Sequence, residues 1–416
     1  MPSRNVPAEH DMSAKLARTG VNLSSAPAFG LILGQALITF ADTALLLIAI
    51  ISVQRSPGGN SAAGAVQQLY ILPFLLLAPF VGALANTSPI RRILLLPTVL
   101  KIAACAGLAF GVSASATIAL LGISAAIYSP AKYSALYAIF DDRKLVMANA
   151  LVEGSAVLMA VSGTMVGGLL ANNPPAVSME IMIGVYFMAA LLTLAVPRLP
   201  PERSLNGENP LTLLRHFGQA VARVFAHQEA RFSLVGTSVL FATGTTLRLL
   251  ILAWAPAVLP AHNKETPMIL MAAASLGVIV GAMTAGRLIP IQYVNRALVP
   301  GLVVGILIAL LAATPQFGMA LALAITIGAC AGAFVVPLNA LLQKSGALSV
   351  GTGYALAIQN FSENLMTFVV VEAYSFVMRN GPPIDNVLVG FGGTLFAAML
   401  LISWMRLMPR GHIRTQ

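Results

Sequence analysis

Runs of about 20 apolar residues recur along this chain and limit what it can fold into. Each is long enough for an α-helix to cross the hydrocarbon core of a bilayer. Backbone polar groups find no water there, so a span of this length must be a helix. The sequence therefore predicts an all-α integral membrane protein with twelve transmembrane helices. The predicted spans are 28–52, 66–86, 93–112, 117–139, 147–171, 177–197, 231–259, 267–288, 298–313, 318–342, 352–378 and 387–406.

The composition agrees with a protein made almost entirely of spans. Of the 416 residues, 58% are hydrophobic and 9% are charged, whereas a soluble domain carries about a quarter charged residues. Cys105 and Cys330 lie in apolar runs far apart in the sequence, which excludes a disulfide framework and a cysteine metal site. The five histidines all lie in polar segments. We therefore expect no metal site and no cofactor.

The basic residues predict the orientation. If the N-terminus is cytoplasmic, 18 of the 24 lysines and arginines fall on the inner side, three (Arg55, Lys264 and Arg379) outside and three within spans. This split is a strong positive-inside signal. It predicts cytoplasmic termini, and it explains the net charge of +10 without nucleic acid. The expected organisation is a cytoplasmic tail (1–27), a six-helix bundle (28–197), a cytoplasmic linker with an amphipathic helix (198–230), a second bundle (231–406) and a tail (407–416).

The two halves of the chain echo each other at a nearly constant offset. Pro130 and Pro337 are 207 residues apart, and Glu153 and Glu363 are 210 apart. Because each half has an even number of predicted spans, both would share one orientation as a parallel repeat. That arrangement resembles the major facilitator transporters, whose substrate site lies between the halves near the midplane. We therefore expect two six-helix bundles related by a pseudo-two-fold axis.

Charged residues inside spans are candidates for function, because each costs about 2.5–3.5 kcal/mol on insertion scales. Asp42 lies midway along the first predicted span and Arg248 midway along the seventh. The repeat puts these helices at related positions, so the two side chains are expected to form a salt bridge when the cleft closes at one end. The alternative is a permanent pair that fixes how the halves dock. A buried pair gains little stability over apolar packing, which favours the gate.

The segment "AAIYSPAKYSAL" (125–136) carries a lysine and a proline inside an apolar run. Tyr128 and Lys132 are four residues apart and share a helix face, and Pro130 can kink the helix. This combination suits an anionic headgroup such as phosphate, with Pro130 and its counterpart Pro337 as structural hinges. Alternatively, Lys132 snorkels to the cytoplasmic interface.

Two further polar pairs follow helical spacing: Asn149 with Glu153, and Gln359 with Glu363. Each pair lies on one face of its helix. The pairs predict either a hydrogen-bonded seam between helices or a polar cleft wall whose carboxylates bind a cation or an amine-bearing headgroup. Lys101, also within a span, is available to pair with a carboxylate.

Several strings together identify a family. "FADTALLL" (40–47), "YSPAKYSAL" (128–136), "RFSLVGTS" (231–238), "TLRLLILAWAPAVL" (246–259), "FVVPLNALLQ" (334–343) and "IQNFSEN" (358–364) resemble the bacterial lysophospholipid transporters of the major facilitator superfamily. By this resemblance, Asp42 and Arg248 match a charged pair across the halves, and Lys132 matches a basic residue. One position departs from the superfamily pattern: Asn86 stands where an aspartate is usual, four residues after Gly82.

The resemblance implies a function. A member of this family moves lysophosphatidylethanolamine and lysophosphatidylglycerol from the outer to the inner leaflet of the Gram-negative inner membrane. A separate acyltransferase/acyl-carrier-protein synthetase then restores the second chain. Alternating access with lateral access from lipid is expected. The alternative is an exporter of hydrophobic drugs with the same fold. The chain has no nucleophile elbow or catalytic acid pair, so we do not expect an enzyme.

Overall fold

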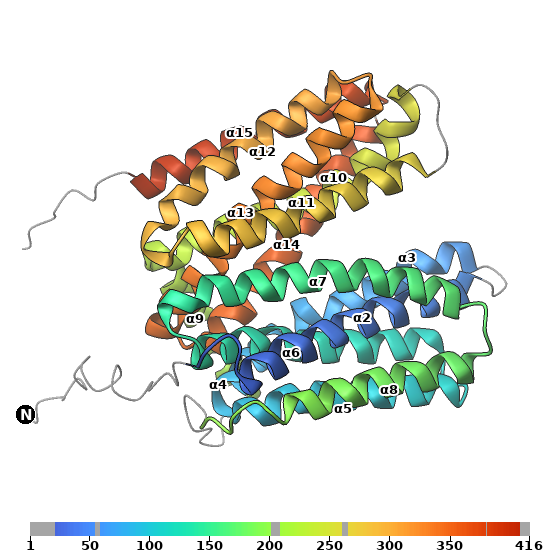
Figure 1. Cartoon of the computed structure of the whole chain (residues 1–416), viewed down its shortest axis with the longest axis vertical. Helices are drawn as coiled ribbons and strands as arrows, with labels where there is room; N and C mark the ends of the chain where they lie inside the picture. Colours follow the sequence, from blue (N-terminus) through green and yellow to red (C-terminus); the bar gives the residue numbers. More distant parts are fainter. Residues whose placement is uncertain (1–20, 55–58, 201–208, 260–264, 380, 408–416) are drawn as a thin grey trace, which may run out of the picture.

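The computed structural model describes residues 21–54, 59–200, 209–259, 265–379 and 381–407, and within them every regular element is a helix. The expected tails at 1–20 and 408–416, part of the linker at 201–208, and the positions of Arg55 and Lys264 lie outside the described residues. The helices form two bundles, one below the other in Figure 1, joined through the linker. This arrangement confirms the predicted fold class.

The first bundle contains the helices of the first half of the chain. These are α2 (Ala26–Gln54), α3 (Gly59–Leu76), α4 (Ala78–Thr87), α5 (Ile90–Ala109), α6 (Ala114–Ile139), α7 (Asp142–Leu170) and α8 (Pro175–Thr193). Helix α9 (Pro210–Ala226) follows in the linker. The second bundle contains α10 (Gln228–Val258), α11 (Thr266–Leu288), the 3-10 helix η1 (Ile291–Ala297), α12 (Leu298–Ala312), α13 (Phe317–Ser349), α14 (Thr352–Arg379) and α15 (Ile384–Leu407).

The ends of the predicted spans agree with the ends of these helices to within seven residues, with one break. The span expected at 66–86 is divided at Leu77 into α3 and α4, which meet at 63°. Pro79 lies in the first turn of α4, where its missing N–H is tolerated, but it cannot continue the hydrogen bonds of α3. Ten described helices are long and apolar enough to cross a membrane, and the bent pair makes eleven. Helix α14 has sufficient length, with polar residues in its middle.

Glycines bring several helices into close contact. A side chain on Gly167 would meet the backbone of Ala44, so α7 lies directly against α2. A side chain on Gly281 would collide with the backbone of Ala329, so α11 lies against α13 in the same way. The glycine pairs Gly163/Gly167 and Gly277/Gly281 thus act in packing, as small residues do between membrane helices.

One end of the molecule gathers the polar loops, and we call it the basic end. There α4 passes into α5, α6 into α7, and α13 into α14, and α9 lies beside them (Figure 1). Its basic residues include Arg91, Arg92, Arg143, Lys144, Arg231, Arg287, Lys344 and Arg406. Helix α14 is buried only near this end: Thr352–Gln359 are buried, and none of residues 360–379 is. The bundles therefore enclose α14 at the basic end and cover its far half only in part.

Candidate functional site

Asp42 is held inside the first bundle. Its Oδ2 lies 2.6 Å from Nζ of Lys101 on α5, and its Oδ1 accepts a hydrogen bond of 2.7 Å from the hydroxyl of Tyr186 on α8. The Lys101 side chain has no exposed surface, while 14% of the Asp42 side chain is exposed. The Lys101 ammonium also lies 5.1 Å from the centre of the Tyr128 ring, within cation–π range. The Lys101 ammonium is thus stabilised by the Asp42 carboxylate and by the face of the Tyr128 ring.

The pair expected between Asp42 and Arg248 is not formed in this conformation. Arg248 lies on an exposed face of α10 together with Phe241, Gly244 and Leu252. It has no ion pair or hydrogen bond with any described residue. Asp42 is therefore paired within its own bundle, whereas Arg248 has no partner among the described residues.

A second polar cluster links the two bundles at their centre. Glu153 on α7 accepts a hydrogen bond from the hydroxyl of Tyr133 on α6, and a longer one of 3.4 Å from Asn339 on α13. Gln359 on α14 donates to Asn339 at 2.8 Å and to Glu363 at 2.9 Å. The two expected carboxylates thus belong to one network that runs from α6 and α7 to α13 and α14.

Lys132 lies beside this network. Its Nζ is 4.4 Å from the centre of the ring of Tyr133, whose hydroxyl donates a hydrogen bond to Glu153. Pro130 and Pro337 lie inside the uninterrupted helices α6 and α13. The cation therefore belongs to a group of charges in the middle of the molecule.

Nearer the basic end, an amide pair and an ion pair connect the two bundles, and we call these contacts the seal. Asn149 and Gln343, both fully buried, exchange hydrogen bonds of 3.1 and 2.7 Å between α7 and α13. Beyond them, Lys344 and Asp142 form an ion pair at 2.5 Å. Asn149 and Glu153 lie on the same face of α7. Asn149 forms part of the seal, whereas Glu153 belongs to the central cluster.

Asn86 makes a further contact across the bundles. Its Oδ1 accepts a hydrogen bond of 2.7 Å from the backbone N–H of Gly353, and its Nδ2 donates to the carbonyl of Val350 at 3.4 Å. It thereby satisfies one of the free N–H groups in the first turn of α14. Gly82 is needed nearby, because a side chain there would press against Tyr354. The amide at position 86 therefore holds the start of α14 without a charge.

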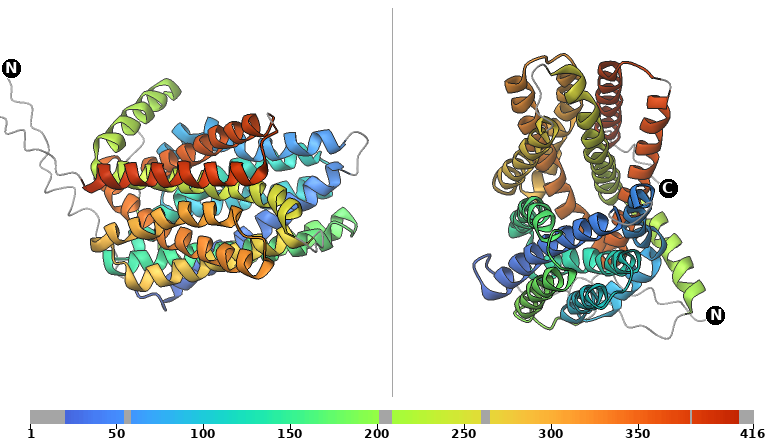
Figure 2. Two further views of the ribbon diagram at one scale, coloured as in Figure 1. Left: turned by 90° about the horizontal axis from the view of Figure 1, so that it is seen from above. Right: turned by 90° about the vertical axis from the view of Figure 1, so that its right-hand side faces the viewer.

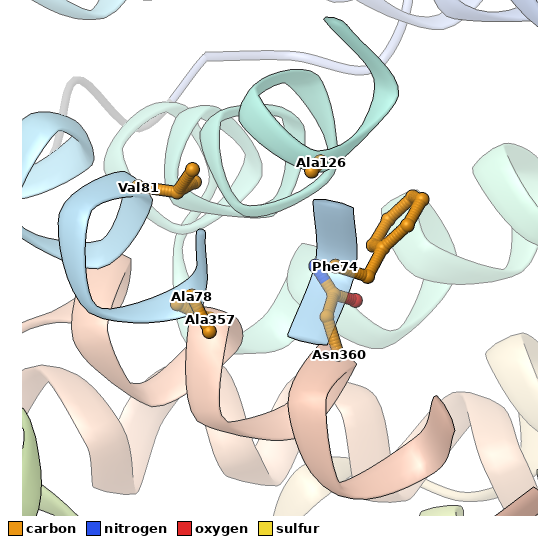
Figure 3. Close-up of a pocket in the computed structure, with 6 residues that line it drawn as sticks. All are labelled: Phe74, Ala78, Val81, Ala126, Ala357 and Asn360. Atoms are coloured by element: carbon orange, nitrogen blue, oxygen red, sulfur yellow. The ribbon is translucent and has the colours of Figure 1, made fainter. Parts of the chain in front are cut away.

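A small pocket lies at the break between α3 and α4. Figure 3 shows its lining: Phe74, Ala78, Val81 and Ala126 from the first bundle, and Ala357 and Asn360 from α14. Its empty space is about 170 Å³ even when the part open to solvent is included, less than the roughly 300–1,000 Å³ of sites that enclose drug-sized ligands. It is too small to hold a whole lysophospholipid.

Several residues of these clusters were not anticipated as site residues from the sequence. Tyr133 and Tyr186 each bind one of the carboxylates, and neither spacing nor charge distinguishes them from the other tyrosines. Asn339 could have been found, because it lies 207 residues after Lys132, the offset that relates the two prolines. Lys101 was recognised as an intramembrane cation, but the sequence does not identify Asp42 as its partner.

The fold and these clusters define a two-bundle membrane transporter, and comparison with known proteins agrees. The family model described as Major Facilitator Superfamily matches residues 31–371. The Escherichia coli fucose:proton symporter has the same fold, with a TM-score of 0.72 over 92% of this chain and all of that chain, at 12% identity. A bacterial homologue of the iron transporter ferroportin gives a TM-score of 0.69 over 91% of this chain and 97% of its own, at 15% identity.

The sequence comparison is more specific. A protein of Photorhabdus laumondii named lysophospholipid transporter LplT is 34% identical over 90% of this chain and 94% of its own length. The protein of the same name from Escherichia coli strain HS is 34% identical over 93% of this chain and 97% of its own. This chain belongs to the Major Facilitator Superfamily and, within it, to the family of lysophospholipid transporters.

Proposed function

We propose that this protein moves lysophosphatidylethanolamine and lysophosphatidylglycerol from the outer to the inner leaflet of the bacterial inner membrane. The observation that carries the proposal is the layer of charged and amide side chains that joins the two bundles inside otherwise apolar spans. Relatives named as lysophospholipid transporters are 34% identical over at least 90% of this chain, which supports the choice of substrate. A separate acyltransferase/acyl-carrier-protein synthetase would then restore the second acyl chain on the cytoplasmic side.

The basic end is placed in the cytoplasm by the positive-inside rule. The seal formed by Asn149 with Gln343, and by Asp142 with Lys344, then closes the cytoplasmic side. The partly covered half of α14 then lies on the side of the outer leaflet. In alternating access, this conformation is the one that receives a lysophospholipid from outside, and the seal must open to release it.

The headgroup is proposed to bind between Arg248 and the central cluster. Charged residues within spans almost always face a bundle interior or a water-filled cavity, and Arg248 has no described protein partner, so its guanidinium is available for the phosphate. Glu153 and Glu363 can accept hydrogen bonds from an ethanolamine ammonium, and Lys132 adds positive charge for the phosphate. Asp42 is already neutralised by Lys101, so we assign it a supporting position instead of a direct contact.

The acyl chain would remain in lipid while the headgroup moves. The far half of α14 exposes Leu365, Phe368, Val369 and Phe376, which are between 44% and 67% exposed. Apart from the exposed Glu372, which lies between Phe368 and Phe376 on this face, the surface is apolar. Lateral access beside α14 would let a single chain stay in hydrocarbon, so the transporter need not enclose the whole lipid.

The test is translocation of a fluorescent lysophosphatidylethanolamine in reconstituted vesicles. Arg248→Ala should slow translocation at least about tenfold, because a hydrogen bond to a charged group contributes about 1.5–3 kcal/mol. Lys132→Ala should reduce translocation of lysophosphatidylglycerol more than of lysophosphatidylethanolamine, since only the former carries net negative charge. Arg287→Ala, an exposed arginine at the basic end, is the matched control. Wild-type translocation by Arg248→Ala would contradict the assignment, and transport of a hydrophobic dye without lysolipid movement would favour the drug exporter.

A further inference from the structure

We propose that α9 is a membrane-docked strap, whose inner side crosses the seam between the bundles and whose outer side binds the anionic lipid of the cytoplasmic leaflet. The proposal rests on the orientation given above, which places α9 at the inner surface of the membrane. In Figure 2, α9 projects obliquely from the flank of the bundles at the basic end, and the spans lie to one side of it.

The inner side of α9 packs on both bundles. Phe217, Ala220 and Val224 are buried in a cluster with Ala78 and Ala83 of α4 on one side and Tyr354 and Ile358 of α14 on the other. The Phe217 ring meets the Phe361 ring edge-on, with centroids 6.1 Å apart. Helix α9 therefore bridges the line along which α4 and α14 must separate when the seal opens.

A second apolar stripe on α9 is exposed. Leu211, Leu214 and Phe225 are 77%, 47% and 41% exposed, and Gly218 and Ala222 continue the same stripe with exposed positions. With 3.6 residues per turn, this stripe lies about a third of a turn from the buried side. The side of α9 with Phe217 and Val224 thus faces the protein, and the neighbouring side with Leu211 and Leu214 is exposed.

The remaining side of the helix is basic. Arg215 and Arg223 are exposed and flank Gln219, and the helix contains no acidic residue. An apolar stripe bordered by arginines is the pattern of a helix lying in the membrane interface. Each arginine near an anionic surface raises the membrane-binding constant about fivefold. The occupant that fits both features is an anionic phospholipid bilayer, with acyl chains against the leucines and headgroups against the arginines.

The first experiment locates the outer side. Cys105 and Cys330 are replaced by alanine, and a nitroxide label is attached at Leu214→Cys. The control label is attached at Gln219→Cys, about 140° around the helix from position 214. In vesicles of phosphatidylcholine and phosphatidylglycerol, the label at position 214 should be relaxed by oxygen and shielded from a water-soluble nickel complex. The label at position 219 should show the reverse. Equal nickel access at both positions would overturn the proposal and leave this side to a protein partner.

The second experiment tests the consequence for transport. Wild-type translocation of lysophosphatidylethanolamine should be faster with phosphatidylglycerol present than in phosphatidylcholine alone. Arg215→Gln/Arg223→Gln should lose this dependence and keep the rate seen in phosphatidylcholine. The matched control, Arg92→Gln/Arg287→Gln, removes two exposed arginines of the basic end outside α9 and should keep the dependence. An unchanged dependence in the α9 variant would contradict the proposal, whereas no transport in any vesicle would refute the proposed function and leave the label result standing.

Discussion

At the residue scale, the main finding is that Asp42 has a resident partner. Lys101 is fully buried, and the Asp42 carboxylate is its only described ion partner. Removing one member of a buried pair leaves an uncompensated charge and costs about 3–5 kcal/mol, whereas replacing both is often neutral. Asp42→Asn should therefore lower the unfolding temperature and stop transport. Adding Lys101→Met should restore much of both, as measured by thermal unfolding in detergent and by translocation.

The matched comparison is Asp42→Asn combined with Arg248→Gln. If Asp42 and Arg248 formed the essential pair, this combination would restore transport and the one with Lys101→Met would not. Our assignment predicts the opposite. Arg248→Gln alone should leave stability within about 0.5 kcal/mol, as an exposed substitution usually does, and still lose transport.

The sequence identified the polar residues of the clusters better than it predicted which of them form contacts with one another. Helical spacing placed Gln359 and Glu363 on one face, and their hydrogen bond follows from that spacing. Spacing carries no information about which neighbouring helix a face meets, so the contact of Lys101 with Asp42 could not be derived. The amide at Asn86 was visible as a departure from a pattern, but its contact with Gly353 depends on the packing of α14 against α4.

At the scale of the elements, close helix contact through glycine holds each bundle together. Gly281→Leu should destabilise the second bundle by about 1–3 kcal/mol or more, because overpacking forces backbone shifts, and the Ala329 backbone lies directly against this position. Gly390→Leu on α15 is the control, since no atom lies within 4 Å of a Cβ there. Unfolding in detergent measures both, and equal stability of the two variants would show that α11 does not depend on this contact.

The element boundaries were largely predictable, because an apolar run long enough to span a bilayer leaves few alternatives. The break at Leu77 was not predicted. Pro73 and Pro79 are visible in the sequence, but proline is tolerated in membrane helices when neighbouring groups satisfy the freed backbone. Pro97, Pro130 and Pro337 lie inside unbroken helices. The packing of α3 and α4 against α6 and α14, and not the proline alone, decides where the bend occurs.

At the scale of the whole molecule, the two bundles are joined at the basic end and cover the far half of α14 only in part. The polar contacts of the seal include the amide exchange of Asn149 with Gln343 and the ion pair of Lys344 with Asp142. Packing of α4 against α14 and of α7 against α11 adds to them. The ion pair is about one third exposed on each side, and such pairs contribute at most about 1 kcal/mol. The ion pair therefore adds little to the free energy needed to open the seal in the proposed alternation between two states.

The most direct test of the account locks this seal during transport. Asp142→Cys/Lys344→Cys, in a chain with Cys105 and Cys330 replaced by alanine, is cross-linked in vesicles with a short thiol-reactive linker that a reductant cleaves. The single variants Asp142→Cys and Lys344→Cys, treated alike, are the controls. The account predicts that translocation of lysophosphatidylethanolamine stops on cross-linking of the double variant and resumes on reduction. Undiminished translocation by the fully cross-linked protein would contradict it.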